Sequence, residues 1–134
     1  YAYCGVVDPD KKKFNYGVTS TPERWATICG LATRLKKLTP ILLERDLPCM
    51  KPAFLKGPGT DPLGHEPVSV MLKRHGNVRY LFAVNTSPEE VTVRYPIAAK
   101  RVDVADEKRS LPVASDGFID TLAPFAVRLY RLAE

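Results

Sequence analysis

The sequence predicts a mainly β protein: an antiparallel β-sandwich of the immunoglobulin-like or Greek-key kind, preceded by one long amphipathic helix and an N-terminal strand remnant. Two observations predict it. Apolar residues recur at helical spacing in the first third of the chain and at strand spacing after residue 68. Short apolar runs at regular intervals are typical of a sandwich or barrel. We expect three regions: residues 1–45, a proline-rich connector at 46–67 and the sandwich at 68–134.

The chain opens on the apolar run Tyr1–Val7, which predicts a strand leading into a polar loop at 8–15. It has no initiator methionine and no signal-peptide pattern. We therefore expect the chain to begin inside a longer protein.

A helix is predicted from Pro22 to Leu38. Thr21 is a suitable N-cap, proline is favoured at the first helical position, and Glu23 complements the positive end of the helix dipole. Pro40 should end or kink the helix, although one more turn could follow. The apolar stripe consists of Trp25, Ile28, Leu31, Ala32, Leu35 and Leu38.

Beyond one short strand near Ala53–Leu55, the sequence predicts the strands of the sandwich. The turn sequence His75-Gly76-Asn77 makes the first two a hairpin. In the last strand we expect the apolar residues, including Phe125, to face the core. The predicted strands are Val68–Arg74, Val78–Asn85, Val91–Tyr95, Lys100–Val104, Ser110–Val113, Gly117–Thr121 and Phe125–Leu132.

The net charge of +5 and the pI near 9.2 raise the question of nucleic-acid binding. The basic residues are spread along the chain, and the only tight cluster is Lys11-Lys12-Lys13 in a predicted loop. Phosphate binding requires a basic stripe on one face. We expect no nucleic-acid partner. No apolar run approaches the roughly 20 residues of a membrane helix, so we expect no membrane partner either.

The three cysteines, Cys4, Cys29 and Cys49, form no Cys-x-x-Cys pair, and His65 and His75 are not spaced to complete a zinc site. We expect buried thiols, no metal and no cofactor. The lack of a disulfide framework favours a reducing or bacterial setting, and we expect a soluble protein, cytoplasmic or secreted.

Two segments carry a resemblance to a known class of enzyme. Tyr16–Trp25 followed by Leu35–Leu42 resembles the last helix of a (β/α)8 barrel and the point where the chain leaves it. Ala83-Val84-Asn85 with a hairpin partner, and a last strand introduced by Leu122-Ala123-Pro124, resemble the β-sandwich that follows such barrels in many glycoside hydrolases. The resemblance implies that residues 1–45 are the end of a barrel.

The resemblance also implies that the catalytic machinery lies elsewhere. Retaining glycosidases use two carboxylates about 5 Å apart. In these barrels the pair lies at the ends of the fourth and seventh strands, upstream of Tyr1, so no catalytic residue is expected here. The loop after the eighth strand belongs to the active-site face. Tyr1, Tyr3 and Asp8 are therefore the candidate sugar-binding residues, with strand packing and an Asp-Pro turn as the alternative interpretation.

Other groups have structural explanations. Asp106 and Asp116 fit turns, and Asp103 and Asp120 complete the set of acid/base candidates. Ser69, Ser87 and Ser110 lack a recognisable His and Asp arrangement. Trp25 could stack on a sugar, but its place in the helical stripe favours packing.

The sequence thus predicts a non-catalytic C-terminal region of a glycoside hydrolase, inactive alone, whose partner is its own barrel. An independent carbohydrate-binding module is the alternative, although such modules present exposed aromatics, and the aromatics here lie in predicted strands. An immunoglobulin-like interaction domain is the third hypothesis. Without the barrel, we expect self-association through residues 1–40, since the helical stripe and strand edge need cover.

Overall fold

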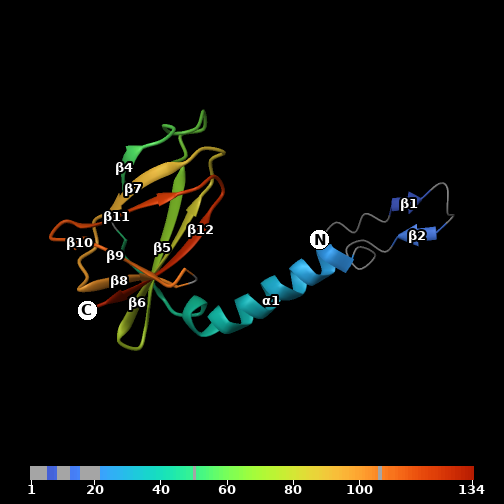
Figure 1. Ribbon diagram of the computed structural model, residues 1–134, viewed down its shortest axis with the longest axis horizontal. Helices are drawn as coiled ribbons and strands as arrows, with labels where there is room; N and C mark the ends of the chain where they lie inside the picture. Colours follow the sequence, from blue (N-terminus) through green and yellow to red (C-terminus); the bar gives the residue numbers. More distant parts are fainter. Residues whose placement is uncertain (1–5, 9–12, 16–21, 50, 106) are drawn as a thin grey trace. The chain divides into compact units, whose positions relative to one another are not determined.

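The computed structural model describes residues 6–8, 13–15, 22–49, 51–105 and 107–134 (Figure 1). It confirms the predicted fold class: the chain is mainly β, its sheets are antiparallel, and the described residues contain one helix. The chain divides into two compact units, Tyr1–Thr39 and Pro40–Glu134.

The first unit contains a pair of short strands. β1 (Val6–Asp8) runs antiparallel to β2 (Lys13–Asn15), with Val6 opposite Asn15. Of the strand predicted at Tyr1–Val7, only Val6 and Val7 are described, and both lie in β1. The predicted loop at 8–15 contains β2, which the sequence pattern did not indicate.

Helix α1 (Pro22–Leu42) begins at the predicted residue and ends four residues beyond the predicted end at Leu38. Pro40 lies inside it, so the helix continues through the proline. A proline inside a helix removes one hydrogen bond and crowds the carbonyl four residues before it, but the residues after it can still donate to the preceding turn. No residue of α1 is buried, and the exposed fractions of Trp25, Ile28, Leu31 and Leu35 are 48, 40, 55 and 47%.

The second unit is built from two antiparallel sheets, which can be followed in Figure 1. The six-stranded sheet has the order β3-β5-β6-β12-β8-β9, and the four-stranded sheet has the order β10-β11-β7-β4. Their strands are β3 (Asp46–Leu47), β4 (Ala53–Lys56), β5 (Val68–His75), β6 (Val78–Asn85), β7 (Val91–Tyr95), β8 (Arg101–Val104), β9 (Arg109–Leu111), β10 (Val113–Ala114), β11 (Gly117–Leu122) and β12 (Val127–Ala133).

The connector supplies one strand to each sheet. β4, predicted near Ala53–Leu55, pairs with β7 and has an irregular register between Phe54 and Lys56. β3 pairs with β5 through only two residues, Asp46 and Leu47, which is too short for any periodic signal.

Two predicted strands differ from the structure in an instructive way. Ser110–Val113 was expected as one strand, but Pro112 separates β9 from β10, which belong to different sheets. Proline has no N–H for a ladder, so the chain changes sheets there. Phe125 does not face the core: it precedes β12, has a φ of 55° and is 65% exposed.

β12 also corrects the expected facing of its apolar residues. Tyr130 and Leu132 are fully buried in the core, whereas Val127 and Leu129 lie on the opposite face. Side chains alternate with a period of two, so residues of unlike parity cannot share a face. Leu129 and Leu132 therefore belong to different sides of the sheet.

The core lies between the two sheets and has an aromatic centre. The ring centroids of Tyr95 and Phe118, from the four-stranded sheet, are 5.0 Å apart, and those of Tyr130, from the six-stranded sheet, lie 5.4 and 5.3 Å from them. Such tilted and edge-on contacts stabilise beyond simple burial. Further buried side chains of the core include Val68, Leu72, Leu81, Val91, Val93, Val102, Leu122 and Leu132.

The predicted hairpin between β5 and β6 is confirmed. His75 lies opposite Val78, leaving Gly76 and Asn77 as the two-residue loop. Gly76 has a φ of 59° and Asn77 is not among the residues with positive φ, which fits a type II′ turn.

Gly117 provides a direct test of the sandwich geometry. Its φ is 118°, and an added Cβ would meet the Tyr95 carbonyl oxygen at 2.0 Å. We expect Gly117→Ala to lower the free energy of unfolding by about 3 kcal/mol or more, because strain and a backbone clash add. Urea unfolding followed by circular dichroism measures it.

Gly59→Ala is the matched control, since nothing lies within 4 Å of its added Cβ and its φ is not in the left-handed region. It should change stability by less than about 0.5 kcal/mol. Equal effects of the two substitutions would contradict the close approach of β11 to β7.

Candidate functional site

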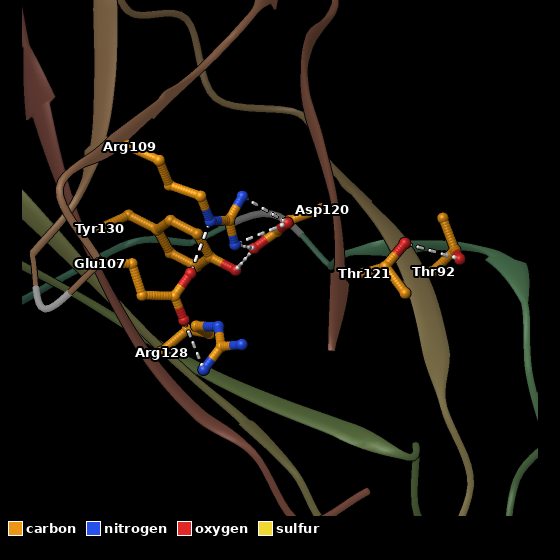
Figure 2. A network of polar contacts seen from close by, with 7 residues as sticks. All are labelled: Thr92, Glu107, Arg109, Asp120, Thr121, Arg128 and Tyr130. Carbon is orange, nitrogen blue, oxygen red and sulfur yellow. Dashed lines mark hydrogen bonds and ion pairs between the residues drawn. The ribbon is translucent and has the colours of Figure 1, made fainter. Parts of the chain in front are cut away.

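A buried carboxylate joins the two sheets. Asp120, on the core side of β11, is 7% exposed (Figure 2). Arg109 of β9 donates from Nη1 to Oδ1 at 3.1 Å and from Nη2 to Oδ2 at 3.0 Å. The Tyr130 hydroxyl of β12 donates to Oδ2 at 2.8 Å. Both carboxylate oxygens are thus satisfied by side chains of the opposite sheet.

The network continues towards the surface through Glu107. Arg109 Nε donates to Glu107 Oε2 at 2.5 Å, and Arg128 Nη1 lies 2.8 Å from Glu107 Oε1. Hydrogen bonds to Asp120 and then Glu107 raise the pKa of Arg109. Burial raises the pKa of Tyr130, and the neighbouring Tyr95 and Asp120 add to the shift. We call Asp120, Arg109 and Tyr130 the inter-sheet clamp.

The inter-sheet clamp stabilises the fold and does not form a catalytic site. A general acid or base must reach a substrate proton, but Asp120 is buried and accepts bonds from an arginine and a tyrosine. The other aspartates are also engaged. Asp103 accepts hydrogen bonds from Ser110 and Arg101, which lower its pKa, and Asp116 pairs with Arg94 at 2.8 Å. Asp106 lies outside the described residues.

A group of apolar side chains lies on the outer face of the six-stranded sheet, which also carries Lys73 and Arg131. Phe82 alternates with the buried Leu81 and Ala83, so it points away from the core. Its directly paired neighbours are Met71 on β5 and Leu129 on β12. Val84 lies opposite Val127 one step further along. We define Met71, Phe82, Val84, Val127 and Leu129 as the apolar outer surface.

The outer face of the four-stranded sheet has a different character. Thr92 and Thr121 are paired across the strands, and their hydroxyls are 3.1 Å apart (Figure 2). Arg94 lies opposite Ile119 and pairs with Asp116. A mainly polar outer face is typical of an antiparallel sheet that has one face in the core and the other in solvent. The six-stranded sheet differs from the four-stranded sheet in carrying the apolar outer surface.

A charged border closes one end of that same face. Lys73 is 6% exposed, and its Nζ lies 2.7 Å from Asp46 Oδ1 and donates to the Glu44 carbonyl at 2.6 Å. His75 Nδ1 lies 2.9 Å from Glu44 Oε1. These contacts fasten the segment that precedes β3 to strand β5.

The candidate sugar-binding residues are not tested by the structure. Tyr1 and Tyr3 lie outside the described residues. Asp8 is in β1, opposite Lys13, and only its backbone is described. Trp25, expected to pack, is half exposed on α1.

The expectation of buried thiols has a mixed outcome. Cys29 is exposed, contrary to the buried position expected, because it lies on a helix without buried residues. Cys49 is half buried, and burial raises the pKa of its thiol. Cys4 lies outside the described residues. Among the described residues no group of three His, Cys, Asp or Glu side chains could hold a metal ion. In that part of the chain no helix is long and apolar enough to cross a membrane.

Comparison with known proteins gives weak structural neighbours. No family model matches the sequence, and no curated protein matches it. The chain is similar to Gan42B, a GH42 β-galactosidase from G. stearothermophilus, and to a catalytic mutant of that enzyme, with TM-scores of 0.45 and 0.44. In each case the identity is 13%, and the match covers 91% of this chain and 13% of the other.

The clamp can be tested with two tyrosines of the same cluster. The Tyr130 hydroxyl donates to Asp120, whereas the buried Tyr95 hydroxyl, which lies beside Tyr130, has no partner of good hydrogen-bond geometry among the described residues. We expect Tyr130→Phe to lower the free energy of unfolding by about 1–3 kcal/mol, because Asp120 loses a donor. Tyr95→Phe should cost less than about 0.5 kcal/mol. Chemical denaturation of both variants measures this, and equal costs would rule out the clamp as a special contributor.

Stability should fall at alkaline pH. Burial raises the pKa of both Tyr95 and Tyr130 above the ordinary value of 10.0. Above about pH 10 the unfolded chain releases these protons and the folded chain keeps them, so their contribution is complete below pH 10 and is lost as pH rises. Each tyrosine should add about 1.4 kcal/mol per pH unit to the decline.

Urea unfolding from about pH 9 to about pH 11 measures how steeply the free energy of unfolding falls with pH. Tyr95→Phe should make this decline shallower by about 1.4 kcal/mol per pH unit, the contribution of one tyrosine. A slope unchanged by Tyr95→Phe would mean that this hydroxyl titrates normally in the folded protein.

Proposed function

We propose that this chain is the non-catalytic C-terminal region of a glycoside hydrolase, in which the sandwich supports a catalytic barrel. Residues 1–45 then contribute the end of that barrel, and the whole enzyme acts on carbohydrate. The class of enzyme rests on the resemblance of the helix and sandwich segments. The supporting role rests on the apolar outer surface of the six-stranded sheet.

The apolar outer surface carries the proposal for physical reasons. Five apolar side chains gather on three adjacent strands, on the face that points away from the core. Val127 is 54% exposed, whereas Leu129, beside Phe82, is 8% exposed. Burying a Phe or Met side chain contributes about 1.5–3 kcal/mol. A neighbouring domain that covered this surface would therefore be held firmly.

The three described aspartates that the sequence offered as acid/base candidates support a non-catalytic role. Asp103, Asp116 and Asp120 each pair with an arginine. A retaining glycosidase requires two carboxylates with different tasks, one to donate a proton and one to attack carbon. These three carboxylates are each paired with an arginine, so none of them is free to donate a proton or to attack carbon.

Two further partners of the chain follow from this proposal. Tyr1, Tyr3 and Asp8 would line the sugar site of the intact enzyme, as the resemblance implies. Without the barrel, the exposed stripe of α1 would favour self-association through residues 1–40.

The supporting role is tested by a pair of matched substitutions. Phe82→Asp places a charge on the apolar outer surface, and Ile119→Asp places one on the outer face of the four-stranded sheet, where Ile119 is 41% exposed. Each variant is made in the 134-residue chain and in the longer enzyme. We expect Phe82→Asp to destabilise the longer enzyme by about 2 kcal/mol more than the isolated chain, because a buried interface is lost.

Ile119→Asp should affect both proteins equally and slightly. Thermal unfolding and aryl-glycoside hydrolysis are the measurements, and we expect hydrolysis only in the longer enzyme. Equal effects of Phe82→Asp in both proteins would contradict an interface at the apolar outer surface. The non-catalytic assignment would be overturned if the isolated chain hydrolysed the aryl-glycoside and a single acidic substitution abolished that activity.

A further inference from the structure

A shallow hollow lies between two loops of the sandwich. Residues 58–61 and 65–67 line one side, and residues 86–88 line the other. Its walls combine the rings of Pro58, Pro67 and Pro88 with polar side chains that include Asp61 and His65. The sequence did not bring these residues together, because the segments are separated by strands β5 and β6.

The first wall is held in one conformation by Asp61. Its Oδ1 accepts hydrogen bonds from the backbone N–H groups of Leu63 and His65, both at 2.8 Å. Its Oδ2 lies 3.0 Å from His65 Nδ1. The Asp61 N–H donates to the His65 carbonyl at 2.9 Å. Hydrogen bonding lowers the pKa of Asp61, so the carboxylate stays ionised. The loop presents His65, whose side chain is 71% exposed, without needing to order on binding.

The second wall is organised by the buried Asn85. Its side-chain nitrogen donates to the carbonyls of Glu89 at 2.7 Å and Ala123 at 2.9 Å, and its Oδ1 accepts from the Ser87 N–H and hydroxyl. The backbone N–H of Thr86 donates to the Pro67 carbonyl at 2.8 Å. One buried amide thus fixes the loop at 86–88 and the turn before β12. The segment Asn85-Thr86-Ser87 matches a glycosylation sequon, but Asn85 is 1% exposed and its amide is engaged, so it is unsuited to glycosylation.

That turn carries an exposed aromatic residue in a strained backbone. The Phe125 N–H donates to the Ser87 carbonyl at 3.2 Å, which places its backbone beside the hollow. Phe125 has a φ of 55° and is 65% exposed. A bulky residue adopts positive φ at a cost, and such strain gathers at functional sites.

We propose that the hollow, together with Phe125, binds a neutral sugar residue. Sugar recognition combines an aromatic ring for the apolar face with fixed donors and acceptors for the hydroxyls. The hollow offers the Asp61 and Glu66 carboxylates, the His65 imidazole and the Thr86 hydroxyl, and no lysine or arginine lines it. This composition disfavours anions such as phosphate. The site is separate from the supporting role and does not depend on it.

The site binds and does not hydrolyse. Asp61, His65 and Ser87 lie around one hollow, as a nucleophilic triad would require. However, the Ser87 hydroxyl donates to Asn85 Oδ1 at 2.8 Å and also lies 3.0 Å from the Glu89 carbonyl. Its proton is directed away from His65, so the serine is not activated.

The test is a nuclear magnetic resonance titration of the 134-residue chain with neutral trisaccharides of glucose, galactose or mannose. We expect at least one to shift the amides of residues 60–66, 86–88 and 125–126 in a saturable way. His65→Ala and Phe125→Gly should each weaken binding by roughly tenfold.

Phe125→Gly separates binding from folding, because glycine tolerates positive φ. Its thermal midpoint should stay the same or rise while affinity falls. Ile119→Ala, an exposed apolar residue on the other sheet, is the control and should leave affinity unchanged. Absence of saturable shifts with every trisaccharide, or shifts unaffected by both site variants, would overturn the proposal whether or not the barrel-supporting role holds.

Discussion

The alignment of the two sheets depends on a buried carboxylate, whose desolvation is unfavourable unless hydrogen-bond donors compensate for it. The Asp120 carboxylate lies between the sheets, and its desolvation is tolerable only while Arg109 and Tyr130 supply donors to both of its oxygens. Those donors come from the opposite sheet, so the sheets must face each other in one alignment. Apolar packing tolerates small slips, whereas three directed hydrogen bonds do not. The aromatic cluster around Tyr130 is thereby held in a fixed relation to β11.

The outer faces of the two sheets differ in the side chains that they present. The paired threonines Thr92 and Thr121 suit contact with water. The apolar side chains around Phe82 suit contact with protein. Successive side chains of a strand point to opposite faces, so the outer side chains can differ between the sheets while the core side chains remain apolar.

The sequence predicted the fold well where the signal was local. The hairpin at Gly76 and the start of α1 at Pro22 follow from turn and capping chemistry that nearby residues determine. It failed where tertiary context decides. Pro112 divides one apolar run between two sheets, and Phe125 looks like a strand residue although Asn85 holds its turn outside the ladder. Hydrogen bonds across long sequence separations leave no periodic trace.

The candidate sites show the same limit. Turn chemistry, predicted for Asp106 and Asp116, fits the turn position of Asp116. The contact between Asp120 and Tyr130 could not be predicted, because the two residues lie on strands of different sheets. The hollow around Asp61 and His65 escaped notice because its second wall comes from beyond two strands. A signal was present in the Asp61-x-x-x-His65 spacing within a proline-rich segment, which favours a rigid loop over a flexible linker.

The brevity of the outermost strands has a consequence for the behaviour of the protein at high concentration. β3 and β10 have two residues, β9 has three, and β4 has four with a break in its register. These are the edges of both sheets, and an edge offers its unpaired N–H and C=O groups to another chain in proportion to its length. Each of these strands is therefore a poor template by itself, although β3 pairs with only two of the eight residues of β5. The four outermost strands thus offer little backbone of their own to the strand-to-strand stacking that leads to fibrils.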